Sequence, residues 1–428
     1  MTILNWARAR ARPLRAASLA VLCAAAWSLA PSVGAASPLS LPQALERAAN
    51  EDLAQPGVRA RLAAGEAAVR HAGVRPNPTV GVDVENVLGS GPRSMIDGAE
   101  TTLYYEQTYE RGGKRNARID LARAELTAAR RRADVLRLNL LHNVQVAYAE
   151  AVAAEAGLLI AEARYMAVIT AQADIDRRVA SARDPLFAGA RAETETARAE
   201  IARDQARTAA RTTRAVLAAF WGGSPDFELD LSPFFNVSLD AVAAAPLDGP
   251  DLALLAAERD IAAARVGVER SRSVTDPTFR AGARYFQQDG EVAIVFGGSI
   301  PLQRDNATRG AVDRAQSERT AAEADMTAAM IGRDREIARL RARLAAAADE
   351  AGRLRDEVIP AAQTTVKLVR EGFNRGGFQY LDVTEAERLL ADARARRVEV
   401  LRSFHLEQAA LDRLTARHAG LTTRTETR

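Results

Sequence analysis

The sequence is poor in cysteine and histidine. Its only cysteine, Cys23, lies in an apolar N-terminal run, so the rest of the chain can form no disulfide and offers no thiol. No two of the four histidines stand at i,i+4 spacing, and no zinc-like ligand set is legible. The glycine pairs Gly112-Gly113 and Gly297-Gly298 lack the context of a phosphate loop. The sequence therefore predicts no catalytic site, no metal site and no cofactor.

Long apolar runs are also missing, except near the N-terminus. There, four arginines precede an apolar run over residues 16–30, and small residues follow at 33–36. A run of about 15 residues is too short to span a membrane, so the pattern predicts a secretory signal peptide over residues 1–36 rather than a membrane anchor. Leu22 before Cys23 disfavours a lipoprotein cleavage site. No later run is apolar enough for a membrane helix, so any membrane segment must be built from strands.

The positive net charge belongs to the leader. The formal charge of the whole chain is +3, and removal of the four leader arginines leaves a net charge of −1. The sequence gives no reason to expect a nucleic-acid partner.

The chain contains an internal two-fold repeat. Asp52-Leu53 and Pro78-Thr79 recur 199 residues later as Asp251-Leu252 and Pro277-Thr278. In each copy an amphipathic helix leads to two alternating strands, a very long helix, a reversal and a return helix. A repeat of this size is the unit of architecture. The predicted organisation is a signal peptide at 1–36, a first repeat at 37–221, an insert or linker at 222–250, a second repeat at 251–419 and a tail at 420–428.

Four segments alternate with period two: 79–88, 101–110, 278–287 and 291–300. In the first, Val80, Val82 and Val84 share one face, and Asp289-Gly290 predicts a tight hairpin turn in the second copy. The pattern fits a transmembrane barrel wall, although a soluble sheet with one wet face alternates in the same way. The signal peptide and the repeat favour the membrane. Four strands cannot close a barrel, so the membrane interpretation requires oligomers, with twelve strands in a trimer.

The remaining segments predict long packed helices. Residues 114–180 and 307–372 are rich in Ala, Arg and Glu, with apolar residues at helical spacing. Reversals are predicted at 181–185 and 374–377, followed by return helices at 186–221 and 381–418. The insert at 222–250 is predicted to be non-helical and to pack on the outside of the helices.

Several motifs carry a family resemblance that covers the chain from about Leu39 to Ala419. They are Arg75-Pro-Asn-Pro-Thr79, Glu110-Arg-Gly-Gly-Lys-Arg115, Phe296-Gly-Gly-Ser-Ile-Pro-Leu302, Gly372-Phe373 with Gly376-Gly377, and Tyr380-Leu-Asp-Val383. Together with the repeat, they resemble the TolC-type outer-membrane efflux protein family. The Gly-Gly-Lys-Arg segment looks most like its heavy-metal, CzcC-like branch.

The resemblance implies an α+β membrane protein in which a long helical coiled-coil barrel continues into a twelve-stranded transmembrane barrel. It implies a homotrimer in the cell outer membrane, with the helical part in the periplasm. The partners would be outer-membrane lipid, a periplasmic adaptor (a membrane fusion protein) and an inner-membrane pump of the resistance–nodulation–division type. The function would be passive export of substrate, with divalent heavy-metal cations as the expected cargo and no enzymatic activity.

The resemblance also implies functional residues. Asp382 and Glu385 match an acidic pair that lines the pore at the periplasmic tip, where three copies would form two acidic rings. Alternatively, Asp382 caps the return helix and Glu385 is its capping-box partner. Phe378 stands where some relatives carry a basic gate residue, and Arg375 is a candidate replacement. The adaptor-docking region at the tip would comprise Asp184, Pro185, Leu186, Gly376, Gly377 and Tyr380.

Three alternatives remain open. The same fold could carry organic drugs or serve type I protein secretion. A periplasmic adaptor has a long helical hairpin too, but only one, flanked by globular β domains. A secreted coiled-coil structural protein would leave the alternating segments unexplained.

Overall fold

The computed structural model describes residues 38–51, 55–87, 90–91, 96–237, 249–302 and 305–421. The predicted signal peptide at 1–36 lies outside these residues, as does most of the predicted tail. The helices and strands belong to the unit that begins at Leu39.

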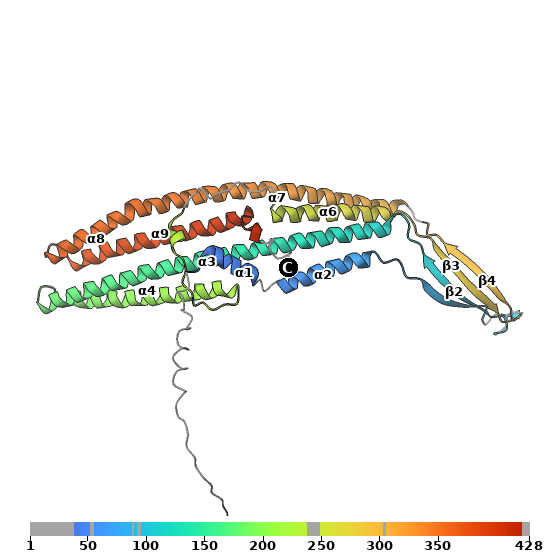
Figure 1. Ribbon diagram of the computed structural model, residues 1–428, viewed down its shortest axis with the longest axis horizontal. Coiled ribbons are helices and arrows are strands. Elements are labelled where there is room, and N and C mark those ends of the chain that lie inside the picture. Colours follow the sequence, from blue (N-terminus) through green and yellow to red (C-terminus); the bar gives the residue numbers. More distant parts are fainter. Residues whose placement is uncertain are drawn as a thin grey trace, which may run out of the picture. The chain divides into compact units, whose positions relative to one another are not determined.

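The four alternating segments form one antiparallel sheet in the order β1-β2-β3-β4 (Figure 1). The strands are β1 (Thr79–Glu85), β2 (Glu100–Thr108), β3 (Thr278–Phe286) and β4 (Val292–Ser299). β1 ends three residues before the predicted position, at Glu85. The pairing of β2 with β3 joins the two repeats, from Glu100 opposite Phe286 to Thr108 opposite Thr278. Among the described residues, β1 and β4 are the two edges of this sheet.

The β3–β4 hairpin closes on a bulge rather than on a simple two-residue turn. Gly290 has φ +70°, and its N–H donates to the carbonyl of Phe286, whose own N–H donates to the carbonyl of Glu291 (3.0 Å each). Gly290 and Glu291 together oppose Phe286, which is the arrangement of a G1 bulge. Because Glu291 bonds to β3, every second residue of β4 counted from Glu291 directs its backbone N–H and C=O toward β3, and the residues between them direct theirs away. The backbone N–H groups of Ile294 and Phe296 therefore point away from β3, toward the free edge.

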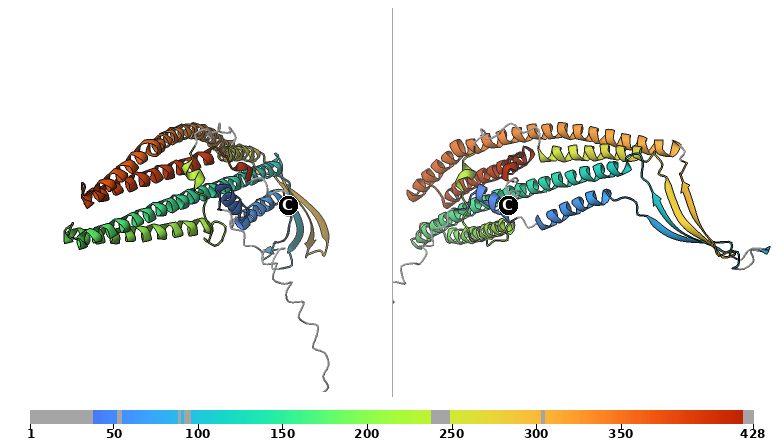
Figure 2. Two further views of the ribbon diagram at one scale, coloured as in Figure 1. Left: turned by 60° about the vertical axis from the view of Figure 1, so that its left-hand side comes forward. Right: turned by 45° about the vertical axis from the view of Figure 1, so that its right-hand side comes forward.

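Helices make up most of the remaining structure (Figure 2). Their bounds are α1 (Leu41–Asn50), α2 (Gln55–Ala72), α3 (Lys114–Ala180), α4 (Leu186–Ala219), α5 (Ser232–Phe235), α6 (Pro250–Ser271), α7 (Asp305–Arg353), α8 (Ile359–Asn374), α9 (Tyr380–Leu414) and the 3₁₀ turn η3 (Ala419–Leu421). α3 packs against α2, α4, α6 and α9, and α8 packs against α9. Small residues permit this close approach, since Ala192, Ala199 and Ala210 of α4 are buried.

The long helix of the second repeat is not continuous. A π-helical turn, η2 (Leu354–Val358), separates α7 from α8, where the sequence predicted one helix over 307–372. Pro360 stands in the first turn of α8. Proline lacks an N–H, and its ring clashes with the carbonyl four residues earlier, so a wider turn just before it relieves both conflicts.

The main apolar core surrounds the middle of α3. Leu141, Val144 and Val152 of α3 lie with Leu45 of α1 and Leu401 of α9, each at most 1% exposed. The insert contributes to this core. It contains one helical turn, α5, against the non-helical prediction, and Phe234 of that turn is 4% exposed. Residues 238–248 of the insert lie outside the described residues.

The composition of α3 also departs from the sequence prediction. By length and composition, α3 contains an 18-residue window apolar enough to cross a membrane, although the sequence had predicted none after the leader. In the structure 44% of that window is buried within the chain. Core helices pass the same compositional test, so the window is weak evidence for a membrane helix.

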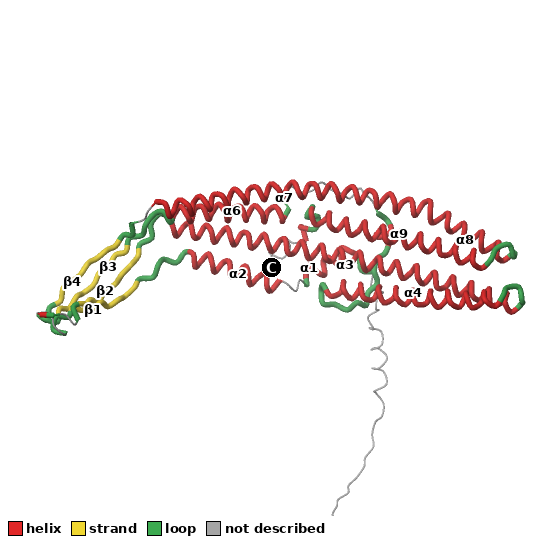
Figure 3. The backbone as a smooth tube through the Cα atoms, turned by 180° about the vertical axis from the view of Figure 1, so that it is seen from behind, coloured by secondary structure: helices red, strands yellow, loops and turns green. Residues whose placement is uncertain are grey.

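The strands and the reversals lie at opposite ends of the helices in this unit (Figure 3). α2, α3, α6 and α7 connect to the strands, and α3–α4 and α8–α9 turn back at the other end. Two distinct places can therefore carry function: the reversals, called the tip below, and the sheet with its junction to the helices.

Candidate functional site

An arginine links the two reversals at the tip. Arg178, near the end of α3, pairs with Asp184 (Nε–Oδ2 2.6 Å) in the first reversal. Its Nη1 also donates to the carbonyl of Phe373 in the last turn of α8, beside the second reversal (3.1 Å), and its guanidinium lies 4.5 Å from the centroid of that phenylalanine ring. A polar contact between the hairpins thus comes from Arg178, a residue that no sequence motif singled out.

Glycines shape the second reversal. Gly376 has φ +84°, a conformation that favours glycine, and the N–H of Gly377 donates to the carbonyl of Gly372 (2.9 Å). A Cβ atom on Gly372 would lie 2.0 Å from the ring of Phe378. The ring of Phe378 therefore rests on the backbone of Gly372.

Tyr380 lies inside the tip. Its side chain is 7% exposed and packs in an apolar cluster with Ile175, Ala188, Ala192, Phe373 and Val383. Among the described residues its hydroxyl has no hydrogen-bond partner, and burial raises the pKa of that hydroxyl. The exposed apolar surface nearby belongs instead to Leu186 (83% exposed) and Phe187 (72%). Pro185 precedes them in extended geometry at the start of α4.

Asp382 and Glu385 are both exposed, on the first two turns of α9. The carboxylate of Asp382 accepts the backbone N–H of Gln379 (2.8 Å), so Gln379 is the cap and Asp382 is its partner at the third position. The alternative interpretation, with Asp382 as the cap and Glu385 as the partner, is wrong by one turn. The cap bond uses one side of the carboxylate and leaves both acids accessible to solvent.

The sheet has one apolar and one polar face. Its apolar residues are exposed along all four strands, including Val82 (59%), Leu103 (55%), Phe279 (61%) and Ile294 (67%). On the other face Arg280 pairs with Asp83 (3.0 Å) and Glu106 (3.1 Å). Arg284 pairs in the same way with Glu85 (2.7 Å) and Glu100 (2.8 Å). Four carboxylates therefore face two guanidinium groups on this polar face.

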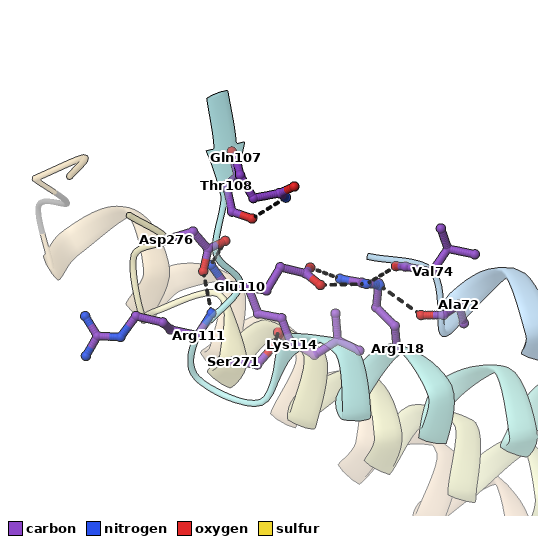
Figure 4. A network of polar contacts seen from close by, with 11 residues as sticks. Ala72, Val74, Gln107, Thr108, Glu110, Arg111, Lys114, Arg118, Ser271 and Asp276 are labelled. Carbon is purple, nitrogen blue, oxygen red and sulfur yellow. Dashed lines mark hydrogen bonds and ion pairs between the residues drawn. The ribbon is translucent and has the colours of Figure 1, made fainter. Parts of the chain in front are cut away.

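A polar network joins the sheet to the helices (Figure 4). Arg118 of α3 forms a two-armed contact with Glu110, which follows β2. The same guanidinium donates to the carbonyls of Ala72 (3.4 Å) and Val74 (3.1 Å), at the end of α2. Arg118 thus satisfies orphan carbonyls of one helix while it holds the start of another.

The second half of the network explains the Gly-Gly-Lys motif. Lys114 pairs with Asp276 (2.6 Å), which also accepts the backbone N–H of Arg111 (2.9 Å). Gly112 has φ +69°, and a Cβ atom there would lie 2.6 Å from Val274. Burial opposes ionisation of Asp276, but the hydrogen bonds from Lys114 and Arg111 outweigh it and lower the pKa of the carboxyl.

No group of three or more His, Asp or Glu side chains that could hold a metal ion gathers among the residues that the structure describes.

Comparison with known proteins adds a family and a set of relatives. Residues 244–417 match the family described as Outer membrane efflux protein. The chain is 29% identical over 406 residues to the cobalt-zinc-cadmium resistance protein CzcC of Cupriavidus metallidurans, covering 90% of this chain and 91% of that protein. It is 28% identical over 260 residues to the nickel-cobalt-cadmium resistance protein NccC of Alcaligenes xylosoxydans xylosoxydans, covering 58% of this chain and 57% of that protein.

The fold is that of solved outer-membrane channels. The outer membrane protein VceC of Vibrio cholerae superposes with a TM-score of 0.68 at 20% identity, covering 88% of this chain and 95% of that chain. The predicted fold class, a helical barrel segment that continues into a β segment, is confirmed.

Proposed function

We propose that this chain is a member of the outer membrane efflux protein family and the outer-membrane channel of a tripartite efflux system that exports divalent heavy-metal cations. It is a passive duct without a catalytic step of its own. An inner-membrane pump of the resistance–nodulation–division type supplies the energy, and a periplasmic adaptor joins the pump to the channel. The cargo is inferred from the similarity to CzcC, which extends over nine tenths of the chain.

The observation that carries the channel proposal is the sheet. Its apolar face is exposed on all four strands, and both of its edges are open in the described chain. In a bilayer neither an open edge nor a polar face can meet lipid. Three chains that pair β4 of one with β1 of the next would close a twelve-stranded barrel, with the apolar face toward lipid and the paired charges toward the lumen.

At the tip, Asp382 and Glu385 would form two acidic rings in the trimer. Both carboxylates are exposed and lie three residues apart on one face of α9. Rings of like charge in a narrow pore favour cations. The adaptor would dock on the tip around the exposed Leu186 and beside Pro185, Asp184, Gly376 and Gly377, while Tyr380 supports this surface from within.

A growth assay tests the cargo. A deletion strain should become sensitive to divalent metals but not to hydrophobic drugs and dyes, and the wild-type gene should restore resistance. The variant Asp382→Asn with Glu385→Gln removes both charges, while the new amide at position 382 keeps an oxygen for the N–H of Gln379. It should restore resistance incompletely.

The matched control is Asp392→Asn, which removes an exposed carboxylate farther along α9 and should restore full resistance. Sensitivity to drugs alone would contradict the metal cargo and support a drug channel. Full resistance in the doubly neutralised variant would contradict the pore role of the acidic pair.

A further inference from the structure

Tyr104 lies flat on the polar face of the sheet. It stands on β2, directly between Gly81 of β1 and Gly282 of β3. A Cβ atom on Gly81 would lie 2.5 Å from both Cζ and the hydroxyl oxygen of Tyr104, so the ring covers the backbone of Gly81. Any side chain at position 81 would have to push the ring of Tyr104 away from the sheet.

Arg280 covers the other side of the ring. Its guanidinium carbon lies 3.7 Å from the ring centroid of Tyr104, while its nitrogens contact Asp83 and Glu106. The order from the wall outward is therefore glycine backbone, aromatic ring and guanidinium. Stacking on an aromatic face and two carboxylate contacts together fix the guanidinium in place.

We propose that Tyr104 and Arg280 form a lining layer that sets the bore of the barrel and its preference for cations. The inference rests on the proposed function, in which this face lines the lumen. Held flat, the ring takes little of the lumen, and the arginine, held by the ring together with its two carboxylates, cannot swing toward passing cations. The wall then presents the excess of carboxylates over guanidinium groups to the cargo.

Single-channel recording of the purified protein in planar lipid bilayers tests the layer. Gly81→Ala should lower the conductance and reduce the permeability ratio of K⁺ to Cl⁻, because the displaced ring carries Arg280 into the lumen. Adding Tyr104→Ala to Gly81→Ala should return the conductance to at least the wild-type value, since the obstructing ring is gone.

Gly297→Ala is the matched control. Gly297 lies on the same face, opposite Arg280, but its added Cβ would lie 3.8 Å from that side chain, an ordinary contact. It should leave conductance and selectivity unchanged. An unchanged conductance in Gly81→Ala, or a loss that persists in the double variant, would overturn the proposal.

If the Gly81→Ala protein does not assemble, two variants of Tyr104 test the role of the ring instead. Tyr104→Phe keeps the ring and should keep the selectivity, whereas Tyr104→Ala frees Arg280 and should lower the permeability ratio. Equal selectivity in these two variants would overturn the role of the ring. Wild-type protein that forms no channels at all would instead contradict the proposed function itself.

Discussion

Asp276 and Lys114 hold the start of α3 against the segment before β3, and they are 162 residues apart in sequence. Their side chains are only 22% and 16% exposed, so solvent screens the ion pair weakly. The lowered pKa of Asp276 means that the folded state favours the carboxylate. Stability from this group is therefore present above the ordinary pKa near 3.8 and is lost as the pH falls through the lower folded value.

We expect Asp276→Asn to destabilise the protein at pH 7 by about 1 kcal/mol, the upper range for exposed ion pairs, because the charge is lost but the shape is kept. Thermal unfolding in detergent at a series of pH values measures this. The gap between variant and wild type should narrow as the pH falls below 3.8 and through the lowered pKa of Asp276 in the folded protein. A gap that stays constant with pH would show that the ion pair contributes nothing.

For single residues, the sequence predicted which side chains matter better than it predicted their hydrogen-bond and ion-pair partners. Glu110-Arg-Gly-Gly-Lys-Arg115 was recognisable as a motif, but the partners of Lys114 and Arg118 were not, because they come from distant segments. The same holds at the tip. Asp382 was correctly placed at a helix start, yet the true cap, Gln379, is an uncommon capping residue and gave no signal.

The sequence patterns predicted the strands and the long helix α3 well, and the π-helical turn not at all. Period-two alternation located all four strands, because a sheet with one lipid face and one wet face repeats every second residue. Good helix formers located α3 from Lys114 to Ala180. The π-helical turn at Leu354–Val358 was missed because Pro360 alone does not show whether a helix kinks, ends or widens.

Adjacent residues of β4 test the assignment of faces. Ile294 lies on the exposed apolar face, and Val295 lies on the polar face opposite Gly282. Ile294→Arg should cost about 2–4 kcal/mol if that face meets the middle of the bilayer. It should therefore lower the amount of folded protein in outer-membrane fractions.

Val295→Arg is the control, since the same side chain would enter the lumen beside a glycine and should be tolerated. Heat-modifiable migration on gels measures the amount of folded protein for both variants. Equal loss in both variants would contradict a membrane-facing apolar surface.

The proposed assembly depends on the number of strands and on the open edges of the sheet. Four strands per chain cannot close a barrel, so a membrane sheet requires several chains, and the family resemblance implies three; the described sheet has the two open edges and the exposed apolar face that this expectation needs. Closure itself would depend on backbone groups of the edge strands. Residues of β4 such as Phe296 direct their N–H away from β3, where a neighbouring β1 would accept them.

We expect light scattering in detergent to give a mass of three chains for the wild-type protein. Phe296→Pro removes an N–H at the free edge and should reduce the fraction of trimer, because proline cannot donate to a neighbouring strand. Phe296→Val keeps both the N–H and the apolar side chain and should remain trimeric. A monomeric wild type would contradict the closed barrel.

The unbroken length of α3 has a mechanical consequence. Its 67 residues extend about 100 Å at 1.5 Å per residue, from the Lys114–Asp276 contact to the Arg178–Asp184 contact. A helix of this length acts as a lever arm. Pivoting it by about 3° at the sheet end would carry its far end through about 5 Å, roughly the rise of one helical turn. Small adjustments of the ion pairs beside the sheet would thereby be amplified into displacements large enough to make or break side-chain contacts at the opposite end.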